Sequence, residues 1–165
     1  VHVSFAEPFC NKLRKLVYDA SKKVECTVHN GGIYVCMEGP LFSTRAESNL
    51  HRSWGASVIG MTVIPEAKLA REAEICYASI ALATDYDCWH EEHDAVTCDA
   101  VLETLKTNSE TAKKILKEAI AMIPDDRDCV CASALATSLV TPRELVPDTT
   151  YKNVQLLVGK YMDKK

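Results

Sequence analysis

The sequence predicts an α/β fold, and three observations carry that prediction. A short apolar run at residues 58–62, a helix-like stretch opening at Pro65 and a second apolar run at 76–84 follow one another along the chain. Strand, helix and strand in this order are typical of a βαβ unit with parallel strands and a right-handed crossover. A long amphipathic stretch follows Asp99 and ends at Pro124, which predicts a further helix.

The segment before this unit is predicted to contain two helices and a hairpin. Pro8 opens the first helix, whose apolar side chains recur at helical spacing: Phe9, Leu13, Leu16, Val17 and Ala20. Residues 26–29 and 33–37, joined by Asn30-Gly31-Gly32, are typical of a hairpin. The run Thr44-Arg45-Ala46-Glu47 fits a capping box at the start of a short helix.

The C-terminal third is harder to interpret. The apolar stripe of the long helix consists of Val101, Leu105, Ala112, Ile115, Ala119 and Met122. Residues 129–140 are predicted to form one more helix. From Thr141 the chain is polar apart from residues 154–158, and we assign no element there.

Composition and charge exclude several classes of protein. The 165 residues are 47% hydrophobic and 25% charged, as in an ordinary soluble domain with its own core. The net charge is −4, whereas proteins that bind nucleic acid usually carry an excess of positive charge. No apolar run is long enough to span a membrane, and residues 1–4 do not begin a signal peptide. We therefore expect no nucleic-acid or membrane partner, and a cytoplasmic location, with the nucleus as a second compartment.

Eight cysteines are spread irregularly along the chain, and we interpret them as buried thiols in a reducing compartment. The pair in Cys129-Val130-Cys131 could ligate a metal, but no second Cys or His pair follows it. The two histidines of His90-Glu91-Glu92-His93 do not have the i, i+4 spacing of a helical zinc site. The sequence therefore predicts no metal site.

Polar residues stand where the two apolar runs of the predicted βαβ unit end. Ligands of open α/β sheets bind beyond the carboxyl ends of the strands, which here are Thr62 and Thr84-Asp85. Asp85 and Asp87 alternate along an extended chain, so both can face one pocket while Tyr86 points away. Two carboxylates on one rim can divide proton donation and acceptance between them. A loop cap or a cation site is the alternative.

Four segments resemble one known family. Residues 38–48 contain Glu38-Gly39-Pro40-Leu41-Phe42, similar to a motif of the trimeric purine nucleoside phosphorylases, and residues 54–62 resemble the strand that carries the ribose and phosphate contacts in that family. The runs Ala83-Thr84-Asp85-Tyr86-Asp87-Cys88-Trp89 and Ala6-Glu7-Pro8-Phe9-Cys10 resemble its S-methyl-5′-thioadenosine phosphorylase branch. The resemblance covers His2 to about Pro124 and implies a homotrimer with a three-layer fold, in which helices flank a central mixed sheet.

The resemblance also implies a role for each matching residue. Phe42 would stack on the purine, Ser43 would contact the base, Met61 would lie against the ribose and Thr62 would bind phosphate. Asp85, the catalytic residue, would protonate or hydrogen-bond the imidazole side of adenine, and Asp87 would accept from its amino group. Tyr86 is counted among the substrate-binding residues. A methylthio pocket would be lined by Cys98, Val101 and Val140, and His2 would reach a neighbouring subunit near that group.

Structural alternatives remain open for several of these residues. Phe42 and Met61 could be core side chains. Thr62 and Ser43 could be local or helix caps. His2 could be a solvated residue.

The implied activity is phosphorolysis of S-methyl-5′-thioadenosine to adenine and 5-methylthioribose 1-phosphate, a step of purine and methionine salvage. Inorganic phosphate is the co-substrate, and no metal or organic cofactor is implied. Two alternatives are a broader purine nucleoside phosphorylase that takes adenosine, and a purine-binding or assembly module without catalysis. The sequence has Leu41 where the family has Arg and Cys98 where it has Val, and the thiol leaves adenosine open as a substrate.

The family places a Gly-rich phosphate loop, an Arg-His pair and a further Thr in an N-terminal half that has no counterpart in residues 1–165. We therefore expect these residues to be one portion of a single domain, its C-terminal part. The functional protein is then longer, or a second chain supplies that half. An intact mass near 18.2 kDa together with full activity would contradict this expectation.

Overall fold

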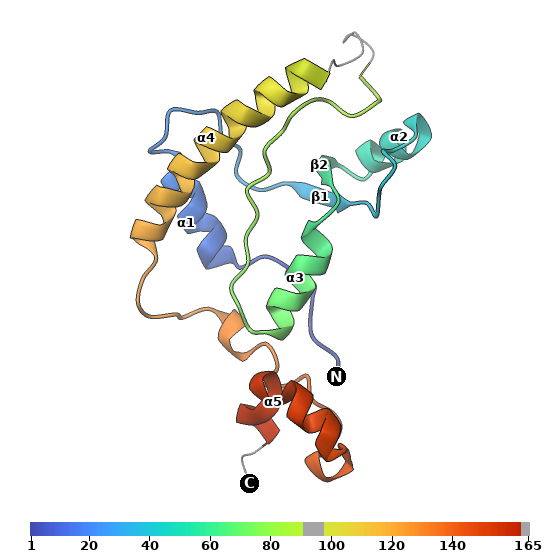
Figure 1. The fold of residues 1–165 in the computed structure, drawn as a ribbon, viewed down its shortest axis with the longest axis vertical. Coiled ribbons are helices and arrows are strands. Elements are labelled where there is room, and N and C mark those ends of the chain that lie inside the picture. Colours follow the sequence, from blue (N-terminus) through green and yellow to red (C-terminus); the bar gives the residue numbers. More distant parts are fainter. Residues whose placement is uncertain (91–97, 163–165) are drawn as a thin grey trace. The chain divides into compact units, whose positions relative to one another are not determined.

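The structure is a computed structural model that describes residues 1–90 and 98–162, and the side chains of residues 98–101 lie outside this description. Its helices and strands confirm the α/β class (Figure 1). In chain order the elements are α1 (Asn11–Ser21), β1 (Ile33–Cys36), α2 (Arg45–Ser53), β2 (Ala56–Gly60), α3 (Val63–Glu72), α4 (Cys98–Met122), the 3₁₀ turns Val130–Ser133 and Arg143–Leu145, and α5 (Asp148–Met162).

The chain divides into two compact units, each built from separate stretches of sequence. The first unit comprises residues 1–14, 65–78 and 124–165. The second unit comprises residues 15–64 and 79–123. In the described part of the chain no helix is both long enough and apolar enough to cross a membrane.

Among its described residues, the second unit has a sheet of two parallel strands. β1 pairs with β2 from Ile33 opposite Ala56 to Cys36 opposite Gly60, with one irregularity after Ile33. The connection between them contains α2, whose N-cap Thr44 forms the predicted capping box with Glu47. Because the strands are parallel, both carboxyl ends lie at the same edge of the sheet.

The predicted hairpin is wrong. Among the described residues, 26–29 form no strand, and β1 pairs with β2 instead. Gly31 and Gly32 have positive φ, as a tight turn would require, but they bring the chain against β2. A Cβ on Gly32 would lie 2.7 Å from the Ser57 Oγ, and that same hydroxyl accepts from the Ile33 N–H at 3.3 Å. The glycines therefore permit a close approach between segments and do not close a hairpin.

The predicted strand at 76–84 is also wrong. Residues 75–84 are described throughout and form no strand. In the first unit the Tyr77 carbonyl accepts from the Cys10 N–H at 2.8 Å, and in the second unit the Ala83 carbonyl accepts from Asn108 Nδ2 at 2.8 Å. These carbonyls accept hydrogen bonds from groups that belong to no strand. The parallel βαβ unit of this structure is therefore β1–α2–β2, and not the predicted unit of residues 58–84.

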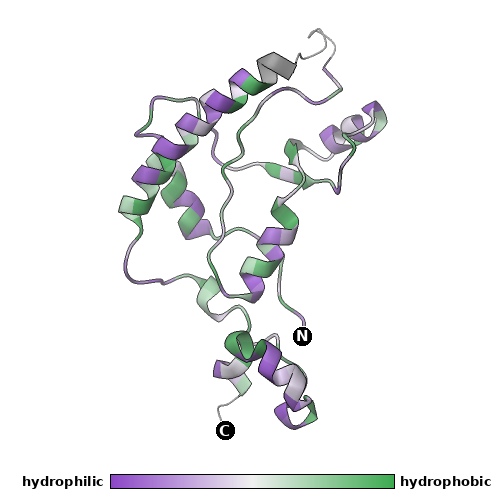
Figure 2. Cartoon of the chain, viewed as in Figure 1, coloured by the Kyte–Doolittle hydropathy of each residue, from purple (hydrophilic) through white to green (hydrophobic). Residues whose placement is uncertain are grey.

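The helix predictions are mostly correct. α1 and α4 match the predicted helices, and Figure 2 shows hydrophilic and hydrophobic residues interleaved along α4. Within its stripe Ile115 and Ala119 are buried, whereas Leu105 is exposed. The predicted helix at 129–140 is wrong, since only the 3₁₀ turn Val130–Ser133 and further turns form there. α5, which we did not predict, buries Tyr151 and Val158 with Leu135 in the core of the first unit.

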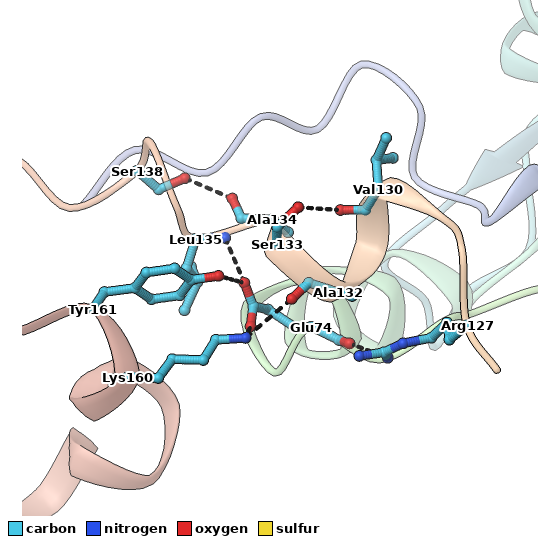
Figure 3. Close-up of polar contacts among 10 residues, drawn as sticks. All are labelled: Glu74, Arg127, Val130, Ala132, Ser133, Ala134, Leu135, Ser138, Lys160 and Tyr161. Atoms are coloured by element: carbon cyan, nitrogen blue, oxygen red, sulfur yellow. Dashed lines mark hydrogen bonds and ion pairs between the residues drawn. The ribbon is translucent and has the colours of Figure 1, made fainter. Parts of the chain in front are cut away.

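A buried carboxylate organises the polar contacts of the first unit (Figure 3). Glu74 follows α3, is 6% exposed and has a left-handed φ of 55°. Its carboxylate forms an ion pair with Lys160 and accepts from the Tyr161 hydroxyl at 2.6 Å and the Leu135 N–H at 2.9 Å. Its carbonyl accepts from Arg127 at 2.7 Å. A left-handed residue after a helix is usually Gly, so the side-chain contacts compensate the backbone strain.

Candidate functional site

Two loops meet at the carboxyl edge of the sheet in the second unit. β1 continues into Glu38-Gly39-Pro40, where Gly39 has φ 73° and the Gly39–Pro40 bond is cis. β2 continues into Met61. A Cβ on Gly39 would lie 2.8 Å from the Met61 Sδ, so the two loops touch only because residue 39 has no side chain.

A third segment joins them through Ser43. The Cys88 thiol donates to the Ser43 carbonyl at 3.3 Å, and the Ser43 hydroxyl lies 3.8 Å from the Met37 sulfur. These contacts bring together the loops that carry the predicted base- and ribose-binding residues: Phe42, Ser43, Met61, Asp85, Tyr86 and Asp87. Phe42 is 84% exposed, so it is not a core side chain within residues 1–165. Met61 is half-buried.

The two carboxylates have different local partners. The Thr84 hydroxyl donates to Asp85 Oδ1 at 2.6 Å, and Asp85 is exposed. Asp87 Oδ1 accepts from the Cys88 N–H at 2.8 Å. This contact orients the Asp87 carboxylate.

Aromatic contacts hold this carboxylate-bearing loop. Tyr86 stacks on His90 with ring centroids 4.5 Å apart and meets Trp89 edge-on at 5.8 Å. The Arg52 guanidinium of α2 lies 3.8 Å from the Trp89 ring centroid, a cation–π contact. α2 thereby anchors the loop, and the Tyr86 ring is engaged in this cluster.

Thr62 directly precedes α3 and is exposed. The first N–H groups of a helix lack intrahelical acceptors and carry partial positive charge. A hydroxyl beside them suits an anion such as phosphate. Thr62 can therefore serve either as a phosphate ligand or as a local cap.

The remaining predicted residues lie elsewhere or outside the described side chains. His2 and Val140 belong to the first unit, where both are exposed and the His2 N–H donates to the Ser138 carbonyl at 2.9 Å. Cys98 and Val101 lie in the first turn of α4, and the predictions for their side chains fall outside the described residues.

The first unit also has a cavity of about 430 Å³, which no sequence pattern predicted. None of the predicted site residues whose side chains the structure describes lines it. Three charged residues line this cavity: Lys68, Arg71 and Glu72. The other lining residues are apolar: Val1, Val3, Phe5, Leu135, Val154, Leu157 and Val158.

A group of side chains with metal-ligand chemistry lies in the first unit. We call it the four-cysteine cluster: Cys10, Cys76, Cys129 and Cys131. Their sulfur atoms all lie within 4.8 Å of one another, and those of Cys76 and Cys129 are 3.2 Å apart. Desolvation raises the pKa of the Cys129 thiol, but hydrogen bonds from its neighbours outweigh that effect and bring the pKa to about 7. Sequence spacing missed the cluster because its members come from three separate segments.

Comparison with known proteins identifies the family. Residues 1–121 match the Phosphorylase superfamily, and the chain belongs to it. Within that family the chain is 55% identical over 161 residues to the S-methyl-5′-thioadenosine phosphorylase of Geobacter sulfurreducens, covering 98% of this chain and 56% of the relative. It is 52% identical over 164 residues to that of Koribacter versatilis, covering 99% and 56%.

Solved structures agree with these matches. A methylthioadenosine phosphorylase from an antarctic soil metagenomic library has a TM-score of 0.88 at 41% identity, over 94% of this chain and 56% of that one. A Schistosoma mansoni methylthioadenosine phosphorylase in complex with adenine has a TM-score of 0.70 at 37% identity, over 77% and 50%. The resemblance inferred from the motifs is confirmed, and the chain spans about half the length of the curated relatives it matches.

Proposed function

We propose that this chain carries the base and ribose side of a phosphorylase that converts S-methyl-5′-thioadenosine and phosphate into adenine and 5-methylthioribose 1-phosphate. The observation that carries the proposal is the convergence of the Phe42-Ser43 loop, the end of β2 and the carboxylate loop at one sheet edge. The S-methyl-5′-thioadenosine phosphorylases of Geobacter sulfurreducens and Koribacter versatilis, to which the chain is similar, support the same substrate. The product would feed purine and methionine salvage.

In this proposal Asp85 is the general acid. Phosphate attacks the anomeric carbon while the N-glycosidic bond breaks and its electron pair moves into the purine. Thr84 donates to Asp85 Oδ1, so we assign the purine to Oδ2, whose proton passes to the imidazole nitrogen of the departing adenine. Neutralising the charge on the leaving group as it develops lowers the barrier.

Asp87 would select the base. Its Oδ1 is held by the Cys88 N–H, which directs the carboxylate as an acceptor for the 6-amino group of adenine. A 6-oxopurine would present an oxygen there and leave two acceptors facing each other, which is unfavourable. The exposed Phe42 ring would stack on the purine, Ser43 would contact it beside the Tyr86 loop, and Met61 would cover the ribose.

Thr62 at the start of α3 would bind phosphate, and we expect the family's other phosphate ligands on a segment beyond these residues. The family resemblance assigns Cys98 and Val101 to the methylthio group of the substrate, and it assigns His2 to a neighbouring subunit of a homotrimer. The proposed reaction uses phosphate as co-substrate and requires no metal or organic cofactor. We place the enzyme in the cytoplasm.

A substrate panel tests the proposed specificity. We expect kcat/KM in phosphate buffer to be highest for S-methyl-5′-thioadenosine, lower for adenosine and lowest for inosine. Comparable values for the first two would favour the broader adenosine-cleaving phosphorylase. Inosine as the best substrate would contradict the role of Asp87. Tight binding of adenine without turnover of any nucleoside would favour a purine-binding module.

The close approach at Gly39 gives a prediction with a matched control. Gly39→Ala should raise KM for the nucleoside about tenfold, because its Cβ would push Met61 away from the ribose. Gly55 has a similar φ of 78°, but a Cβ there meets only an Ile33 methyl at 3.8 Å. Both variants share a left-handed strain of about 1–2 kcal/mol. Steady-state kinetics should show the KM increase in Gly39→Ala alone, and an equal increase in Gly55→Ala would refute the steric explanation.

A further inference from the structure

The four-cysteine cluster has the geometry of a mononuclear tetrathiolate site. Zinc binds thiolates at about 2.3 Å in a tetrahedron, which places the sulfurs about 3.8 Å from one another. The sulfurs of the cluster are all within 4.8 Å of one another, and those of Cys76 and Cys129 are 3.2 Å apart. Small side-chain adjustments would bring all four to equal distances around one ion.

The surroundings of the cluster suit a closed structural site. Cys10 and Cys131 are each 3% exposed, and the other two are half-buried. The Leu13 N–H donates to the Cys10 sulfur at 3.5 Å, and the Arg71 guanidinium lies 3.9 Å from the Cys131 sulfur. Four thiolates around one divalent ion leave a net charge of −2, which a backbone N–H and a guanidinium partly offset. No fifth ligand position is needed, because structural zinc sites are filled by their protein ligands.

A metal ion bound at the four-cysteine cluster would connect separate segments of the first unit. The members of the cluster come from the segment before α1, the segment after α3, and the start of the 3₁₀ turn Val130–Ser133 with the residue that precedes it. These are three separate stretches of the first unit. Metal binding would cross-link these stretches and displace four thiol protons to solvent. The cluster shares no residue with the proposed substrate site, so this inference stands independently of the proposed function.

We propose that the four-cysteine cluster binds one zinc ion that stabilises the first unit. The test is elemental analysis of the purified protein, prepared under reducing conditions without chelator. We expect about one zinc ion per chain, released stoichiometrically when a mercurial blocks the thiols. Replacement by cobalt(II) should produce thiolate-to-metal charge-transfer bands and the visible bands of a tetrahedral ion.

Variants separate the cluster from the other thiols. Cys129→Ser and Cys131→Ser should each lose most of the bound zinc and unfold at lower temperature, whereas Cys26→Ser, outside the cluster, should retain it. If the cluster variants do not fold, the zinc content of the unaltered protein and the release of zinc by the mercurial still test the proposal. Two results would overturn the proposal: a protein without stoichiometric zinc whose thiols react freely, or a mass showing that the cluster forms disulfides in place of binding metal.

Discussion

Asp85→Asn is expected to reduce kcat/KM for S-methyl-5′-thioadenosine by about 10²–10⁴-fold, the usual contribution of a general acid. The amide cannot give up a proton to the departing adenine. It can, however, donate a hydrogen bond toward a 6-oxopurine, so some activity with inosine should appear. The loss should fall mainly on kcat, because Phe42 and Met61 are untouched. Steady-state kinetics with both nucleosides, in the complete protein, measure the change in preference.

Asp126→Asn is the matched control, because that exposed aspartate has no part in the proposed site. Its kinetics should equal those of the unaltered protein. An Asp85→Asn variant that keeps both its rate and its preference for 6-aminopurines would remove Asp85 from the mechanism.

Glu74→Ala is expected to lower the free energy of unfolding by roughly 2–3 kcal/mol, because three partners lose a buried carboxylate. These partners are Lys160, Tyr161 and the Leu135 N–H, as Figure 3 shows. Glu74→Gln should cost less, since an amide oxygen can still accept from Tyr161 and Leu135. Urea denaturation measures both. Glu72→Gln, an exposed neighbour on α3, should change the unfolding free energy little.

The same carboxylate predicts a pH dependence. Burial by itself raises the pKa of Glu74, but hydrogen bonds from Lys160, Tyr161 and Leu135 outweigh it and place the pKa below its ordinary value. A carboxyl whose pKa is lower in the folded state stabilises the fold above its unfolded pKa of about 4.3. This contribution is lost as pH falls through the lower, folded pKa. The unfolding free energy of Glu74→Gln should therefore decline less with acid than that of the unaltered protein.

Local patterns predicted much of the secondary structure. The capping box at Thr44 and the spacing of apolar residues in α1 and α4 depend on near neighbours, and these predictions are correct. α5 was missed although Tyr151, Val154, Val158 and Tyr161 recur at helical spacing after Asp148, an acidic helix start. That signal was present, but the polar residues between the apolar ones obscured it.

Pairing between distant segments could not be derived in this way. Apolar runs at 33–36, 56–60 and 76–84 are all compatible with strands, and only the choice of partners decides which become strands. The motif resemblance identified the residues of the proposed site, yet it did not show that Cys88 bonds to the Ser43 carbonyl or that Gly39 faces Met61. Sequence spacing could not predict the four-cysteine cluster either, because its members come from segments that are distant in the sequence.

The proposed phosphorolysis is tested by the phosphate dependence of adenine release from S-methyl-5′-thioadenosine by the purified complete protein. We expect no release without phosphate and, with phosphate, one 5-methylthioribose 1-phosphate for each adenine. Equal release without phosphate, with free methylthioribose as the product, would make the protein a hydrolase and exclude phosphorolysis.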